Sequence, residues 1–235
     1  LSQDAFLRWL FESFDCEDNL SLTEASQQVL KKLCKICDED IIEVKTYSQW
    51  HKVDIFTVIK TDKRIIALFI EDKVFSGEHN QLSRYNEIIE KSYLNKNWEL
   101  NKLGCTEKDI VKVFYKTLWM SEKENEIVKN AGWELYDIKR VLCLFKNYTN
   151  TDCVLLKQYI EHISKIETLL HTHEMPLQCE DELKLIKWKA YFEFELLPKL
   201  KIDYKKYVSV SRKLQQMKKD MTECKITVVS IFCQE

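Results

Sequence analysis

The sequence predicts an α/β protein in which helices flank a mixed β-sheet. Two neighbouring runs rich in β-branched and aromatic residues predict a β-hairpin, and apolar residues at helical spacing precede and follow it. With 235 residues, of which 45% are hydrophobic and 31% charged, the chain can bury a sizeable core, which argues against disorder. Only three glycines and two prolines are present, which favours long regular elements over many tight loops.

The segment before the hairpin predicts two helices and one strand. The first helix is expected over residues 3–14, where apolar residues recur on one face. The second is expected over residues 23–37, and a strand over residues 41–46. Cys34 and Cys37 form a C-x-x-C pair in the second helix, and because no second pair completes a zinc site, we expect buried helical cysteines.

The hairpin itself is predicted over residues 54–60 and 64–73. If Asp62 and Lys63 form a two-residue loop, paired positions sum to 125, and Asp54 lies directly opposite Glu71. Period-two alternation then places Lys73 on the face of Glu71. Both faces of the hairpin are otherwise apolar, so we expect its strands to lie inside the sheet.

The remainder of the chain predicts mostly helices with two further strands. A helix is expected from about residue 80 to residue 93, a strand over 109–120 and a short strand over 133–136. Two more helices are expected over 139–148 and 151–171. These elements complete a core over residues 1–175, followed by a mainly helical extension over residues 176–235 that either stands apart or packs on the core.

The acidic residues at the open end of the hairpin suggest a metal-binding site. Two neighbouring carboxylates repel each other, and burying them costs several kcal/mol unless a proton or cation compensates. Asp54 and Glu71 would offer an all-oxygen site without a nearby histidine, which favours Mg²⁺ or Mn²⁺ over zinc. The ammonium of Lys73 could hold an attacking water and offset charge on a phosphate. The alternative is a charged strand end with a cross-strand salt bridge.

The helix after the hairpin adds the motif Gln81-X-X-X-Tyr85. The order Asp54, Glu71-X-Lys73 and Gln81-X-X-X-Tyr85 resembles the PD-(D/E)XK nuclease superfamily, although Val53 replaces the usual proline before the aspartate. The resemblance implies a restriction-endonuclease-like three-layer sandwich. It also implies a nuclease that hydrolyses phosphodiester bonds, with DNA as the expected substrate and Mg²⁺ or Mn²⁺ as the cofactor.

The resemblance also implies which groups hold the metal. Asp54, Glu71 and the backbone carbonyl of Asp72 would be ligands. Asp4, near the start of the first helix, matches an acidic position that joins the metal site through a water or a second ion in a bacterial branch of the superfamily.

The remaining motif residues would act around the metal. The resemblance implies that Lys73 orients or helps to deprotonate the attacking water. Gln81 would position a water, the lysine or a phosphate, and Tyr85 would pack behind it or contact the substrate backbone.

The C-terminal extension is basic. Residues 184–225 contain 12 Lys or Arg and 5 Asp or Glu, whereas the whole chain has a net charge of −2. Such asymmetry would suit contact with nucleic acid, for which Lys205 and Lys206 are candidates. A solvated helix face is the simpler interpretation of the same pattern, because an apolar stripe runs through the segment.

Two other functions stay open. The chain could be a noncatalytic binding or assembly module that retains the nuclease fold, or a nuclease that acts on RNA. Nine cysteines scattered through hydrophobic contexts are typical of reduced thiols, no run approaches the roughly 18 apolar residues of a membrane helix, and no signal peptide is evident. We therefore expect a cytoplasmic protein that binds no membrane, and the sequence does not indicate an oligomeric state.

Overall fold

The computed structural model describes residues 2–74, 81–118, 120, 122–172, 184–191 and 195. The chain divides into two compact units, residues 1–172 and residues 173–235, and each is considered by itself. The boundary expected after residue 175 and the candidate contacts Lys205 and Lys206 lie outside the described residues.

The first unit contains a mixed five-stranded sheet with the strand order β1-β2-β3-β4-β5. The first three strands pair antiparallel, and the last two continue the sheet in parallel. The strands are β1 (Ile41–Trp50), β2 (Val53–Thr61), β3 (Ile65–Lys73), β4 (Ile110–Lys116) and β5 (Glu134–Tyr136). This sheet confirms the expected mixed topology.

The central hairpin has the register expected from the sequence. Ile55 pairs with Ile70 and Lys60 with Ile65, so paired positions sum to 125. The backbone N–H of Thr61 donates to the carbonyl of Arg64 at 2.8 Å, which closes the two-residue loop. Strands β2 and β3 have a neighbour on each side, and most of their side chains are buried, which explains why both of their faces are apolar.

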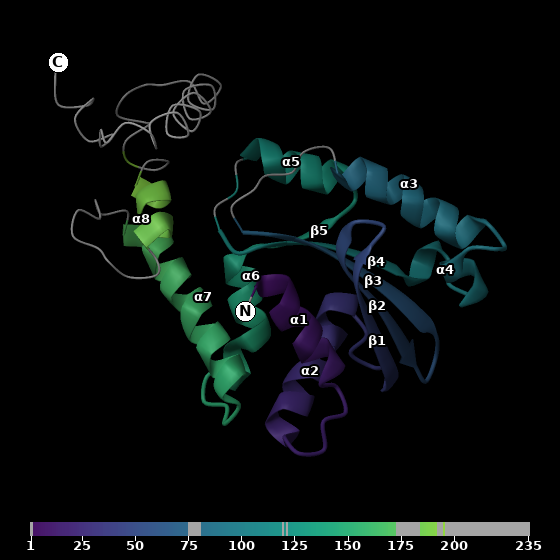
Figure 1. Ribbon diagram of the computed structural model, residues 1–235, viewed down its shortest axis with the longest axis horizontal. Coiled ribbons are helices and arrows are strands. Elements are labelled where there is room, and N and C mark those ends of the chain that lie inside the picture. Colours follow the sequence, from purple (N-terminus) through teal and green to yellow (C-terminus); the bar gives the residue numbers. More distant parts are fainter. Residues whose placement is uncertain are drawn as a thin grey trace, which may run out of the picture. The chain divides into compact units, whose positions relative to one another are not determined.

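Helices cover both faces of the sheet, which gives the three layers of a restriction-endonuclease-like sandwich (Figure 1). One face carries α3 (Gln81–Leu94), α4 (Glu99–Lys102) and α5 (Glu122–Asn130). The other carries α1 (Gln3–Glu12), α2 (Leu20–Cys34), α6 (Ile138–Phe145) and α7 (Val154–Thr172). Short 3-10 turns occur at Glu107–Asp109 and Lys146–Tyr148, and α8 (Lys184–Ala190) belongs to the second unit.

Aromatic side chains fill the space between the sheet and each helical layer. Phe56 and Phe69, a cross-strand pair, stack at 4.8 Å beneath α3 and α4. On the opposite face, Phe6 of α1 stacks on Tyr159 of α7 at 3.6 Å. Aromatic pairs of this kind pack each helical layer onto the sheet and onto its neighbouring helices.

Some boundaries differ from those that the sequence predicts. The second helix ends at Cys34, because Lys35 adopts a left-handed conformation (φ 56°) that terminates it. Cys37 is therefore outside the helix and exposed, and the expectation that both cysteines are buried was wrong for this residue. Strand β1 continues to Trp50, and β4 ends at Lys116, before a helix, α5, that periodicity did not predict.

Two further expectations were that the cysteines are reduced thiols and that no helix spans a membrane. The cysteines in the described part are free: Cys16, Cys34, Cys37, Cys105, Cys143 and Cys153. No helix among the described residues is long and apolar enough to cross a membrane.

Candidate active site

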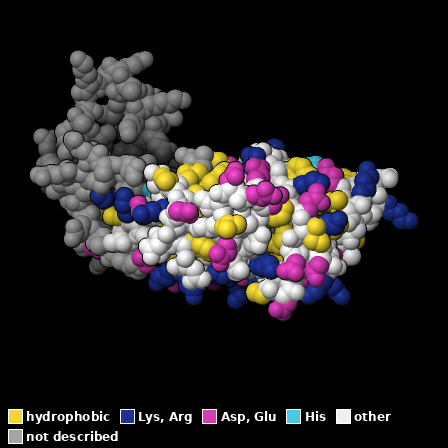
Figure 2. Space-filling model, turned by 90° about the horizontal axis from the view of Figure 1, so that it is seen from below, with side chains coloured by type: hydrophobic (Ala, Val, Ile, Leu, Met, Phe, Trp, Pro, Cys, Tyr) yellow, Lys and Arg dark blue, Asp and Glu magenta, His cyan; other side chains and the backbone are white. Residues whose placement is uncertain are grey.

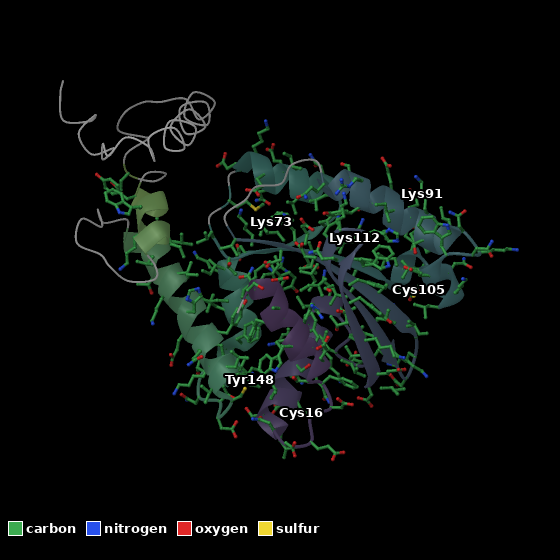
Figure 3. All side chains as sticks on the ribbon, in the orientation of Figure 1. Cys16, Lys73, Lys91, Cys105, Lys112 and Tyr148 are labelled. Atoms are coloured by element: carbon green, nitrogen blue, oxygen red, sulfur yellow. The ribbon has the colours of Figure 1, made fainter. Side chains whose placement is uncertain are left out.

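The candidate site lies where β2 begins and β3 ends. Asp54 is the second residue of β2, and Glu71 and Lys73 are among the last residues of β3. The antiparallel register continues from the pair Ile55 and Ile70 to place Asp54 beside Glu71. Figure 3 shows Lys73 at this end of the sheet. The hairpin therefore brings together the three residues that the sequence proposes for catalysis.

Glu71 is the most constrained of these side chains. It is 1% exposed, and its Oε1 pairs with Lys73 Nζ at 2.5 Å. Its Oε2 is buried and accepts no hydrogen bond from the described residues. Burial raises the pKa of Glu71 to about 7; the charge of Asp54 adds to the rise, and Lys73 opposes it. Among the described residues, one oxygen of the Glu71 carboxylate thus has no donor, and the negative charge of Asp54 acts on the same group.

The Asp54 carboxylate is fixed by two donors. The side-chain amide of Gln49 donates to Oδ1 at 3.2 Å, and the backbone N–H of Asp72 donates to Oδ2 at 2.9 Å. Both donors come from residues next to strand ends, so the orientation of the carboxylate is set by the sheet. A ligand held in this way loses little freedom when it binds a cation.

Asp72 points to the face opposite Glu71, as alternation requires, and meets the start of α1. The Gln3 side-chain amide donates to the Asp72 carboxylate, and Thr117 Oγ1 donates to Gln3 Oε1 at 2.7 Å. Burial raises the pKa of Asp72 to about 7; Gln3 opposes this, and the charges of Asp54 and Asp4 add to it. The network joins α1, β3 and the residue after β4.

Sequence reasoning proposed Asp4 for the metal site, and here the charge of Asp4 acts on Asp72; it missed Gln3 and Thr117. Gln3 could have been found as the neighbour of Asp4 on the first turn of the helix. Thr117 could not, because the parallel pairing of β3 with β4 has no local signal in the sequence.

Lys116 is a second lysine that sequence reasoning missed. It pairs in register with Lys73 across β3 and β4 and is 3% exposed. Its Nζ lies 3.6 Å from Glu124 Oε1 of α5. A buried ammonium needs such a partner, because its desolvation is costly. This ion pair connects α5 to the end of β4.

The two residues of the Gln-X-X-X-Tyr motif lie on α3. Gln81 is its first residue and is partly buried. Tyr85 is 1% exposed, and its hydroxyl donates to the backbone carbonyl of Lys52 at 2.9 Å. Burial, followed by the charge of Glu71, raises the pKa of Tyr85 to about 12, so the phenol stays neutral. Tyr85 packs behind the site in this structure, and a contact with the substrate remains a prediction.

The donor set fits a divalent cation. The described residues contain no group of three or more His, Cys, Asp or Glu side chains that could hold a metal, so Asp4 does not complete such a group. The pair Asp54 and Glu71, supplemented by a backbone carbonyl, would supply oxygen ligands only, which suits a hard cation such as Mg²⁺ or Mn²⁺. The buried Glu71 Oε2, which has no donor within the described part of the chain, supports this fit, because a cation would satisfy it.

Comparison with known proteins agrees with this geometry. A family model described as the PD-(D/E)XK nuclease superfamily matches residues 4–168, which include Asp54, Glu71, Lys73, Gln81 and Tyr85. Searches of curated proteins and of solved structures gave no match. Nucleases of this superfamily act on nucleic acid and generally use divalent metals. The match covers well over half of the chain, and the protein therefore belongs to the PD-(D/E)XK nuclease superfamily.

Proposed function

We propose that this protein is a Mg²⁺- or Mn²⁺-dependent nuclease that hydrolyses phosphodiester bonds in DNA. The observation that carries the proposal is the pair of carboxylates at the end of the central hairpin. Glu71 is buried, one of its oxygens has no donor among the described residues, and burial, with the charge of Asp54 adding to it, raises its pKa. Such an arrangement weakens a folded protein unless a proton or cation compensates, which makes a binding role a better explanation than packing.

Asp54 and Glu71 would hold the cation, with the backbone carbonyl of Asp72 as a further ligand. When bound, a divalent ion neutralises charge that develops on the phosphate. The hydrogen bonds from Gln49 and from the Asp72 N–H fix Asp54, so the geometry exists before the substrate arrives. Asp4 would act through a water or a second ion.

Lys73 would orient the attacking water or, because its ammonium stabilises negative charge, help to deprotonate it. Its ammonium is already held at 2.5 Å from Glu71 Oε1, and its side chain is 12% exposed, so it reaches a site that solvent can enter. Gln81, at the first turn of α3, would position a water, the lysine or a phosphate. Lys205 and Lys206 are proposed as contacts to the nucleic acid outside this site.

The free cysteines of the described part suit a reducing compartment, so we place the activity in the cytoplasm.

A cleavage assay tests the proposal. Supercoiled circular DNA, linear DNA and RNA would each be incubated with the protein and Mg²⁺ or Mn²⁺, with a chelator control. We expect metal-dependent cleavage of DNA, which Lys73→Ala abolishes while the circular dichroism spectrum stays unchanged. Lys60→Ala is the matched control, because Lys60 lies exposed on the other strand of the same hairpin.

Three other results of the cleavage assay would change the proposal. Equal cleavage by Lys73→Ala and the wild type would contradict the assigned site. Cleavage of RNA alone would replace DNA with RNA as the substrate. Metal binding without cleavage of any substrate would support the noncatalytic module instead.

A further inference from the structure

The turn between β1 and β2 has an unusual backbone and lies beside the candidate site. Gln49, His51 and Lys52 all adopt left-handed conformations, with φ values of 55°, 47° and 76°. Residues with a Cβ atom rarely adopt this conformation, and three within four positions need support from the surrounding structure. The turn therefore holds a defined shape.

Two hydrogen bonds from the candidate site supply part of that support. The Gln49 side chain donates to Asp54, and the Tyr85 hydroxyl donates to the backbone carbonyl of Lys52. Both bonds link the turn to residues of the proposed cleavage centre. Whatever the turn presents to solvent is consequently held at a fixed position relative to Asp54.

The turn presents an aromatic surface. The exposed ring of His51 lies 4.5 Å from Trp50 at 88° and 6.1 Å from Trp98 at 20°, so it is nearly parallel to Trp98. Trp98 is 36% exposed and Tyr47 is 46% exposed. Trp50 is anchored from below by Phe56 at 5.0 Å. We call Tyr47, Trp50, His51 and Trp98 the aromatic platform.

A cavity of about 320 Å³ opens beside the platform. Its lining includes Tyr47, Trp50, Leu103 and Lys102. The indole N–H of Trp50 donates to Glu99, which also lines the cavity and fixes that ring. Lys52 and Lys102 are both exposed at the margins of the platform. Flat apolar rings bordered by ammonium groups match the two chemical parts of a nucleotide, the base and the phosphate.

We propose that the aromatic platform binds an unpaired base of the nucleic acid substrate next to the cleavage centre. The inference rests on the proposed nuclease function and specifies its substrate class: single strands, or duplexes with an unpaired end near the cut. Away from the ends of an intact duplex, each base is stacked between its neighbours, so it cannot lie on His51 or Trp98. Stacking is tolerant of sequence because every base has a π-face.

On one face of the described residues, the charges do not favour purely electrostatic attachment of nucleic acid. On the face drawn in Figure 2, acidic and basic side chains are interspersed over the described residues. Mixed charges of this kind give little long-range attraction for phosphates. Stacking on the aromatic platform would supply affinity that does not depend on a basic patch.

The test compares binding of a short labelled single strand and a blunt duplex of the same sequence by fluorescence anisotropy, with EDTA present so that no cleavage occurs. For Trp98→Ala and for His51→Ala we expect the dissociation constant for the single strand to rise at least about fivefold, the low end of the effect of one stacked base. Binding of the duplex should change by less than about twofold. Trp98→Phe, which retains a ring, should stay within about twofold of the wild type.

Leu20→Ala is the control, because Leu20 is 79% exposed on α2 and distant in sequence from the platform. Unchanged single-strand binding in Trp98→Ala would overturn the proposal, as would an equal loss for single strand and duplex or the absence of single-strand binding by the wild type. Cleavage assays separate the two claims. If the wild type cuts no substrate but binds single strands through Trp98, the nuclease proposal fails and the proposal for the aromatic platform stands. If the wild type cuts nucleic acid but binds single strands independently of Trp98, the nuclease proposal stands and the proposal for the platform fails.

Discussion

Replacing Glu71 with glutamine should stabilise the metal-free protein above neutral pH and abolish cleavage. The amide has the size of the carboxyl group but cannot ionise, so it resembles the protonated form of Glu71. Because Glu71 is buried and Asp54 lies beside it, its pKa is raised from 4.5 to about 7. A stabilising substitution at the centre of an active site is the expected result when function requires a strained arrangement of charge.

The magnitude follows from proton linkage. A carboxyl group with a folded-state pKa above its unfolded value binds its proton more tightly in the folded protein, so stability falls as the pH rises from about 4.5 to about 7 and is constant above. For a pKa of 4.5 unfolded and about 7 folded, the loss of unfolding free energy between pH 5 and pH 8 is about 2–3 kcal/mol. The glutamine variant lacks this contribution.

Urea denaturation in EDTA, followed by far-ultraviolet circular dichroism at both pH values, measures the difference. Between pH 5 and pH 8 the wild type should lose about 2–3 kcal/mol more of its unfolding free energy than Glu71→Gln loses. Other titrating groups, including Asp72, are common to both proteins and cancel. Equal pH dependence in the two proteins would show that Glu71 is not destabilised by burial and by Asp54, and the reasoning about the site would fail.

Three further substitutions test Asp54 as a ligand, Gln3 as the donor to Asp72, and the packing of Phe69. Asp54→Asn removes the repulsion, so the pKa of Glu71 should fall and Mn²⁺ binding measured by calorimetry should weaken at least about tenfold; undiminished affinity would argue against Asp54 as a ligand. Gln3→Ala leaves the Asp72 carboxylate without its donor and should cost about 1–2 kcal/mol in urea denaturation, whereas the exposed control Gln28→Ala should stay within about 0.5 kcal/mol. Phe69→Ala should cost about 3–5 kcal/mol because it empties a buried stacked position, and a loss below about 1 kcal/mol would contradict the packing described here.

The hairpin could be predicted from the sequence because its information is local. A two-residue loop fixes the register of the strands that it joins, and the register fixes which side chains are opposite each other. The sequence therefore predicts that Asp54, Glu71 and Lys73 lie together, and the structure has the same register.

The parts that could not be predicted depend on contacts between segments that are distant in sequence. Lys116 and Thr117 reach the site only because β4 pairs in parallel with β3, and that pairing depends on tertiary packing. Helix α5 is polar along most of its length and buries only Val128, so its apolar pattern was too weak to identify. The left-handed turn at His51 and Lys52 also lacks the glycine or asparagine that usually marks such conformations.

The central claim is that Asp54 and Glu71 share one divalent cation. Crystals grown with Mn²⁺ and measured at a wavelength where manganese scatters anomalously would test it directly. We expect an anomalous difference peak between the two carboxylates and within coordination distance of the backbone carbonyl of Asp72. A fully loaded crystal with no peak there, or with the two carboxylates turned away from a shared ion, would contradict the account.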